Sequence, residues 1–140
     1  MMANKTFLGS VHRNQPEQRE RPAGAVITPG MLVQETDREL VPHVDAGFVL
    51  VAKELTAAFD ADGGLTTDYQ VGDTAQAYIP ESGDMYWMLL AAGQTVEQDS
   101  PLESNGAGLL IVAASPATAV AFADEAITTA DNTPVRVRFK

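Results

Sequence analysis

The residues T-A-Q-A-Y-I-P-E-S-G-D-M-Y-W-M-L-L-A (74–91) indicate the fold class more clearly than any other part of the sequence. In T-A-Q-A-Y-I (74–79), apolar side chains fall on one face of an extended chain, because successive side chains of a strand point to opposite faces. The residues 85–91 are nearly all apolar, which is typical of a buried strand. Between them, P-E-S-G-D (80–84) predicts a hairpin-like connection.

Further strand signals lie on both sides of this stretch, with turn residues between them. The C-terminal V-R-V-R-F-K (135–140) alternates apolar and basic side chains. G-F-V-L-V-A-K (47–53) is β-branched and aromatic, and L-E-S-N-G-A-G-L-L-I-V-A (102–113) has a Gly-rich turn before a strand. T-P-G-M (28–31) has Pro and Gly where a type II turn requires them. Many short strands separated by turns predict a mainly β protein, a small β-barrel or sandwich.

Two alanine-rich segments are compatible with either a helix or a strand, namely K-E-L-T-A-A-F (53–59) and T-A-V-A-F-A-D-E-A-I (118–127). For 118–127 we expect a strand. Val120 and Phe122 fit a short barrel strand, and Pro116 blocks extension of the element towards the N-terminus. The choice for 53–59 stays open.

The chain has 140 residues, which is the size of one domain. Its composition, 45% hydrophobic and 20% charged, is that of a globular protein. The first 24 residues differ from the rest, because N-Q-P-E-Q-R-E-R-P (14–22) has neither a strand nor a helix period. We therefore expect an extended N-terminal arm over 1–24 and a single β domain over 25–140. Such an arm is either a disordered tail or a segment that orders on a partner.

The net charge of −10 is unevenly distributed. Residues 41–135 contain 14 acids and one cation, Lys53, whereas 136–140 contain three cations. Because an acidic body repels phosphate, we expect neither nucleic acid nor an anionic membrane as a partner. The acidic surface either keeps the protein soluble or docks on a basic partner. The apolar runs are far shorter than the roughly 20 residues that a membrane helix needs, and the N-terminus has no pattern of a secretory signal.

The sequence contains no recognisable catalytic or metal-binding pattern. There is no cysteine, which excludes disulfides and thiolate ligands. H-V-D (43–45) places a histidine and an aspartate on one strand face, but no third ligand is near, and we expect His12 and His43 to be surface polar residues. In D-A-D-G-G (60–64) the ligand residues do not have the spacing of a calcium loop, so we predict a turn there. We therefore expect no catalytic residue, no metal and no cofactor.

Several segments together carry a resemblance to a known family. They are D-Y-Q-V-G-D (68–73), Y-I-P-E-S-G-D-M (78–85), L-A-A-G-Q-T-V-E-Q-D-S-P-L-E-S-N-G-A-G-L-L (90–110), A-V-A-F-A-D-E-A-I (119–127) and P-V-R-V-R-F (134–139). In this order they resemble the small capsid decoration (cement, head-stabilising) proteins of tailed bacteriophages. The resemblance covers residues 25–140. It departs from the family at Q-D-S (98–100), where a Gly-Asp turn is more usual.

The resemblance implies a virion structural protein and not an enzyme. Such proteins lie on the outer surface of an icosahedral capsid, bridge neighbouring major capsid subunits and stabilise the head after assembly in the host cytoplasm. Other copies of the chain are a second implied partner, with a homotrimer expected by analogy. We expect the arm to make the capsid contacts, through Phe7, Leu8, Val11, Arg13, Arg19 and Arg21.

A different function class also fits the composition. A soluble small-ligand-binding or protein-interaction β-barrel module of non-viral origin would use the aromatic residues of the central strands. Tyr78, Tyr86 and Trp87 are expected to be core residues, as most aromatics are. The ligand-binding alternative instead predicts a pocket lined by Trp87 and Tyr78.

Overall fold

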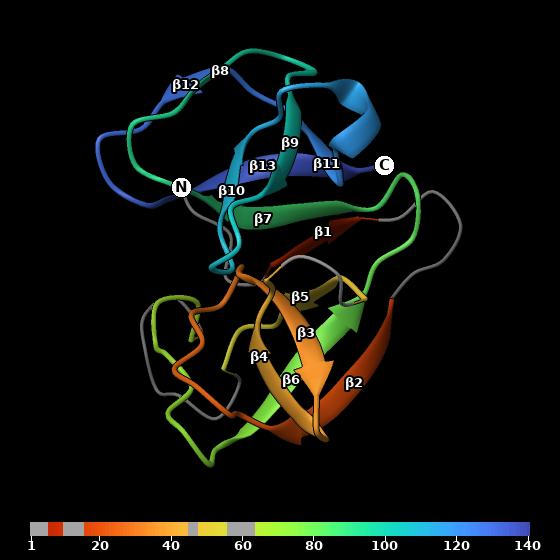
Figure 1. Cartoon of the computed structure of the whole chain (residues 1–140), viewed down its shortest axis with the longest axis vertical. Coiled ribbons are helices and arrows are strands. Elements are labelled where there is room, and N and C mark those ends of the chain that lie inside the picture. Colours follow the sequence, from red (N-terminus) through yellow and green to blue (C-terminus); the bar gives the residue numbers. More distant parts are fainter. Residues whose placement is uncertain (1–5, 10–15, 45–47, 56–63) are drawn as a thin grey trace.

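Strands make up nearly all the regular structure of the residues that the structure describes. A computed structural model describes residues 6–9, 16–44, 48–55 and 64–140 (Figure 1). The strands are β1 (Phe7–Gly9), β2 (Glu17–Pro22), β3 (Leu32–Thr36), β4 (Glu39–Pro42), β5 (Leu50–Ala52), β6 (Thr74–Ile79), β7 (Met85–Leu90), β8 (Thr95–Val96), β9 (Pro101–Ser104), β10 (Leu110–Val112), β11 (Ala121–Ala123), β12 (Ile127–Thr128) and β13 (Thr133–Phe139). Within the described residues the one helix is a 3-10 turn, η1 (Pro116–Thr118), and no helix is long and apolar enough to span a membrane. The predicted β fold class is confirmed.

The larger sheet is organised around β7. Its strand order is β1-β7-β10-β9-β11-β13, and β13 also pairs with β7 along its length. These pairings close β7, β10, β9, β11 and β13 into a ring, with β1 added beside the start of β7. β8 and β12 form a separate two-stranded ribbon. Figure 1 shows this sheet in the upper half of the molecule.

The second sheet, of order β2-β6-β5-β3-β4, curls until its two edges meet. Ala23, just after β2, bridges Leu40 of β4, and the Gly24 N–H donates to the Leu40 carbonyl at 2.9 Å. Gly24 allows this approach, because a Cβ atom there would lie 2.9 Å from Val41 Cγ1. We call this closed five-stranded unit the small barrel; it lies below the larger sheet in Figure 1.

The connection between β6 and β7 corrects one prediction. Residues 80–84 do form a turn, in which the Asp84 N–H donates to the Glu81 carbonyl at 3.1 Å and Gly83 has a φ of +89°. However, β6 belongs to the small barrel and β7 to the larger sheet, so the turn does not make a hairpin. Local turn residues specify that the chain reverses, but the strand partners come from segments far away in the sequence.

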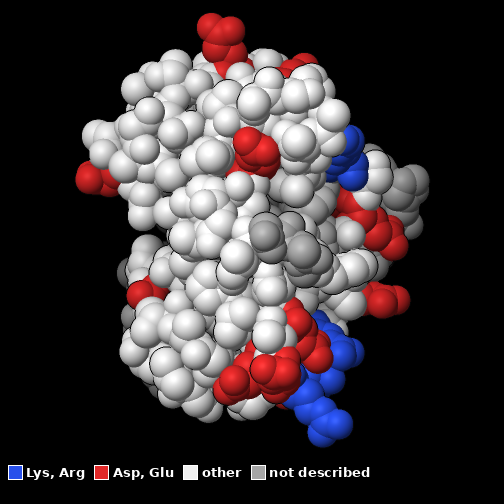
Figure 2. Space-filling model, in the orientation of Figure 1, with Lys and Arg blue, Asp and Glu red and all other residues white. Residues whose placement is uncertain are grey.

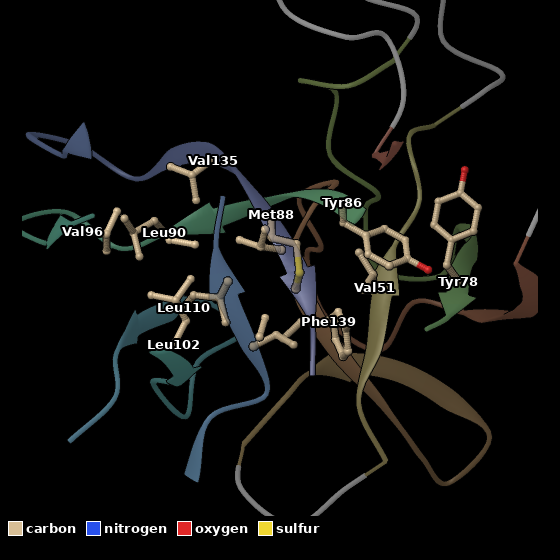
Figure 3. Close-up of a cluster of buried hydrophobic side chains, with 14 of the residues drawn as sticks. Val51, Tyr78, Tyr86, Met88, Leu90, Val96, Leu102, Leu110, Val135 and Phe139 are labelled. Carbon is tan, nitrogen blue, oxygen red and sulfur yellow. The ribbon is translucent and has the colours of Figure 1, made fainter. Parts of the chain in front are cut away.

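Buried hydrophobic side chains form two clusters, one centred on each sheet. The small barrel encloses Ala23, Ile27, Val33, Leu40, Leu50, Ala52, Tyr69, Ala75 and Ala77. The larger cluster is drawn in Figure 3 and spans both sheets. It includes Leu32, Val51 and Tyr78, which lie on the outer face of the small barrel and pack against the larger sheet. This shared cluster holds the two sheets together.

An aromatic group forms the centre of this junction. The ring centroids of Phe7 and Tyr78 are 5.9 Å apart, and those of Tyr78 and Tyr86 are 5.8 Å apart. Tyr86 also meets Phe139 edge to face at 5.8 Å. Tyr78 and Tyr86 are therefore core residues, as predicted, whereas Trp87 is only partly buried.

The predictions for the C-terminal half agree with the structure. Residues 118–127 contain β11 and the start of β12, so the preference for a strand is confirmed. In β13, Val135, Val137 and Phe139 are buried and the basic residues between them are exposed. Residues 53–55 are in neither a helix nor a strand, and the rest of 53–59 lies outside the described residues.

Among the first 24 residues, β1 and β2 belong to the two sheets, although the sequence predicted an extended arm there. Phe7 is 8% exposed and belongs to the larger core, and β2 pairs with the whole length of β6. β2 was not predicted because its inward positions carry arginines in place of apolar side chains, so the strand lacks the usual alternation of apolar and polar residues.

Candidate interaction surface at the end of the small barrel

Two of the predicted capsid-contact residues, Arg19 and Arg21, lie on the inward face of β2. Arg19 is paired with Ala77 of β6, and Arg21 with Ala75. Residues directly opposite each other in an antiparallel pair share a face of the sheet, and both alanines are buried in the small-barrel core. The small alanine side chains leave room above them for the two long arginines, whose charged ends reach the solvent.

Glu35 of β3 binds both arginines across the end of the small barrel. Arg19 Nε donates to Glu35 Oε1 at 2.6 Å and Arg19 Nη2 to Oε2 at 3.2 Å, while Arg21 Nε donates to Oε2 at 3.2 Å. The hydrogen bond from Arg19, assisted by that from Arg21, lowers the pKa of Glu35 from 4.5 to about 2. The same contact raises the pKa of Arg19. Glu35 and Arg19 therefore stay charged over the whole neutral range.

A hollow of about 290 Å³ lies beside this ion cluster. Its lining consists of Arg19, Glu35, Phe48, Leu50 and Ile79. Phe48 is 73% exposed, more than any other large hydrophobic residue in the described part of the chain. An exposed aromatic ring next to an apolar hollow with a charged rim is the composition of a protein-binding patch. We call these five residues the barrel-end surface.

The structure does not bring the six predicted contact residues together. Arg19 is on the barrel-end surface and Arg21 adjoins it, but Phe7 packs between Tyr78 and Tyr86 in the larger core. Leu8, next to it in β1, is partly buried. Val11 and Arg13 lie outside the described residues. Capsid contact through these side chains stays a prediction, and for Phe7 it would require the residue to leave the core.

Sequence reasoning missed Glu35 and Phe48. Glu35 could have been found, because it is separated by one residue from the buried Val33 and so shares its inward face. Phe48 was assigned to a strand over 47–53, but β5 begins only at Leu50. Aromatic side chains are usually buried, and nothing in the local sequence indicates that this one is exposed.

A second hollow, of about 270 Å³, lies where β4 and β9 approach each other. It is lined by His43, Val44, Glu103, Ser104, Thr118 and Val120. The expectation that His43 is a surface residue is wrong: it is 3% exposed, and its Nδ1 lies 3.0 Å from Ser104 Oγ. Backbone bonds to Leu32 and Gly108 hold it between the two sheets. In the described part of the chain no three His, Asp or Glu residues are grouped as a metal site requires.

Two buried carboxylates flank the aromatic junction. Glu54 accepts hydrogen bonds from the Thr6 N–H at 2.9 Å and from the Tyr78 hydroxyl at 3.2 Å. Asp84 accepts one from the Tyr86 hydroxyl at 3.2 Å. Burial, and then the nearby Glu54 carboxylate, raises the pKa of Tyr78 well above its ordinary value. The Glu54 contacts join elements of both sheets, and the Asp84 contact lies at the start of β7, so both carboxylates serve the fold. Neither of the two hollows is lined by Tyr78 or Trp87, unlike the pocket that the ligand-binding alternative predicted.

Comparison with known proteins gives a likeness in fold. No model of a protein family matches the chain, and no curated protein sequence matches it. Among solved structures, the chain is similar to that described as "The crystal structure of head fiber gp8.5 N base in bacteriophage phi29", with a TM-score of 0.59 and 12% sequence identity. The likeness covers 89% of this chain and 93% of that one. At this level of identity, it establishes that the two chains share a fold.

Proposed function

We propose that this protein is a structural component of a tailed-phage head, which lies on the outer surface of the capsid and bridges neighbouring major capsid subunits. The observation that carries the proposal is the fold likeness to the base of a head fiber, which extends over nearly all of both chains. The sequence resemblance to capsid decoration proteins over residues 25–140 supports the same class independently. In this role the protein binds and stabilises, and it catalyses no reaction.

The architecture suits a part that must transmit load without deforming. The strands of each sheet are closed or nearly closed on themselves, and one hydrophobic cluster joins the two sheets. Each contact with a capsid need not be strong, because a lattice repeats it many times. The barrel-end surface is our candidate for this contact, since it combines the exposed Phe48 with an apolar hollow.

Other copies of the same chain are the second proposed partner, with a homotrimer as the expected assembly. Three copies around one axis would each present a barrel-end surface to the capsid and gain affinity through multivalency. Native mass measurement of the free protein checks this part of the proposal separately. Monomers, both in solution and on the particle, would remove the trimer without affecting the capsid role.

Rebinding to phage particles stripped of this protein tests the proposed function. Wild-type protein should restore occupancy, as measured by densitometry of gels of purified particles. Phe48→Ser should weaken rebinding about thirtyfold, the effect expected when an aromatic hot-spot residue is lost. Val71→Ser is the matched control, because Val71 is also exposed but lies outside the barrel-end surface, and it should rebind normally.

The outcomes separate the function from the site. Failure of the wild-type protein to rebind would contradict the capsid role. Equal rebinding of Phe48→Ser and Val71→Ser would show that Phe48 is not part of the contact. A metabolite that raises the unfolding temperature in a thermal-shift screen would favour the ligand-binding alternative instead, since a decoration protein needs no small ligand.

A further inference from the structure

The outer face of β13, continued by Lys140 directly after it, carries three cations among partly buried apolar side chains. Arg136 of β13 is paired with Trp87 of β7. Arg138 is paired with Met85 on one side and with Phe122 of β11 on the other. Paired residues share a face, so these side chains form one surface that points away from the larger core. We define the β13 outer face as Met85, Trp87, Phe122, Arg136, Arg138 and Lys140.

Two of these cations have no acidic partner in the described part of the chain. Arg136 is the exception, because its Nη2 lies 3.4 Å from Asp124 Oδ2. Arg138 donates only to the Gly83 carbonyl, at 3.4 Å, and to the Met85 sulfur, at 3.7 Å. Lys140 Nζ donates to the Pro116 carbonyl at 3.1 Å.

Arg138 and Lys140 follow each other on one side of the strand, on a molecule whose net charge is −10. In Figure 2 the basic side chains gather near the C-terminus and at the lower end of the view, while acidic ones are spread over the surface. The β13 outer face is thus a positive patch available to a partner from outside the chain.

The apolar residues of the face point to a protein partner. Trp87, Met85 and Phe122 are each partly buried, so they offer apolar area between the charges. Tryptophan, methionine, phenylalanine and arginine are the residue types enriched at the centres of protein interfaces, and tryptophan and arginine supply most of the strong contacts. A site that recognised charge alone would not need the aromatic rings of Trp87 and Phe122.

We propose that the β13 outer face binds an acidic segment of another protein. A short acidic segment can bind Arg138 and Lys140 without extending further, whereas a longer nucleic acid would also lie against the acidic rest of the protein, which repels its phosphates. A second copy bound by the same face would place cation against cation, which is unfavourable. This inference does not depend on the proposed function, and it concerns a different surface from the barrel end.

The single tryptophan of the chain makes the proposal testable. Trp87 lies on the face itself, so its fluorescence should change when poly-L-glutamate is titrated into the protein at low salt. The change should be largely lost at about 0.15 M salt, because exposed charges are then screened. The double variant Arg138→Gln, Lys140→Gln should weaken binding about tenfold, the sum of two exposed ion pairs. Arg38→Gln removes one cation from the β3–β4 turn and should bind as the wild type does.

Three results would overturn the proposal. The double variant binding poly-L-glutamate as tightly as the wild type would show that these cations are not used. Tighter binding of duplex DNA than of poly-L-glutamate would make the face a phosphate site. A protein that self-associates without any probe, and ceases to do so in the double variant, would make a second copy the occupant. Circular dichroism of the double variant checks that the fold is kept, as the exposure of both residues predicts.

Discussion

Two strands of this molecule, β2 and β13, carry arginines at alternate positions. The arginines of β2 are on the inward face of their sheet, whereas those of β13 are on the outward face of theirs. Arg19 and Arg21 lie on the inward face of the small barrel and both bind Glu35. Arg136 and Arg138 lie on the outward face of the larger sheet, and the inward positions of β13 are apolar. The same sequence pattern thus serves in one place to close a barrel and in the other to build an exposed surface.

The neighbouring strand accounts for the difference. β6 presents alanines opposite Arg19 and Arg21, so a long side chain fits over the core and its charge reaches the barrel end. β7 presents the large, fully buried Tyr86 and Met88 opposite the inward residues of β13. The size of the cross-strand partner, which the strand's own sequence does not reveal, decides whether arginine is tolerated inside.

The largest loss of stability is expected when a charge is placed on the inward face of β13. Val137→Asp should lower the free energy of unfolding by about 4 kcal/mol or more, because the carboxylate would be buried without a partner next to Tyr86. Arg138→Asp, one residue away on the outward face, should cost about 1 kcal/mol or less. Urea unfolding of both variants measures the difference, and equal losses would contradict the assignment of the two faces.

The same contrast explains which parts of the fold were predictable from the sequence. β6 and β13 alternate apolar residues with polar ones and were identified within a few residues of their bounds. The type II turn at 28–31 was also identified, and the Met31 N–H donates to the Thr28 carbonyl at 3.0 Å. Each of these signals depends only on local residue types. β2 was missed because its inward residues are charged.

The candidate site was predictable only in part, and for a different reason. Arg19 and Arg21 were selected because they lie in a segment without periodicity, whereas their actual place depends on pairing with β6. Glu35 joins them only because the sheet curls until β2 and β4 meet. The burial of His43 likewise follows from the packing of β4 against β9. Long-range pairing of this kind leaves no trace in a single sequence.

A smaller effect is expected from removing the acid that holds the two inward arginines. Glu35→Gln should lower the midpoint of urea unfolding, because Arg19 and Arg21, which share one face of β2, would then repel each other without a carboxylate to bind them. The control is the same substitution in an Arg19→Gln, Arg21→Gln background, where it should have much less effect. An equal effect in both backgrounds would mean that Glu35 acts on the fold by some other contact.

The smallest expected effect is the pH dependence of this same contact. The pKa of Glu35 is lowered from 4.5 to about 2 in the folded protein, so the folded state favours the charged carboxylate. Its contribution to stability is therefore complete above pH 4.5 and is lost as the pH falls towards 2. The midpoint of urea unfolding, measured against pH for the wild type and for Glu35→Gln, should differ by a constant amount at neutral pH and converge in that acidic window. Because other carboxylates titrate in both proteins, only the difference between the two curves reports on Glu35. A difference that stays constant down to pH 2 would mean that the arginines do not distinguish the charged from the neutral form, and that Glu35 supports the barrel end by packing alone.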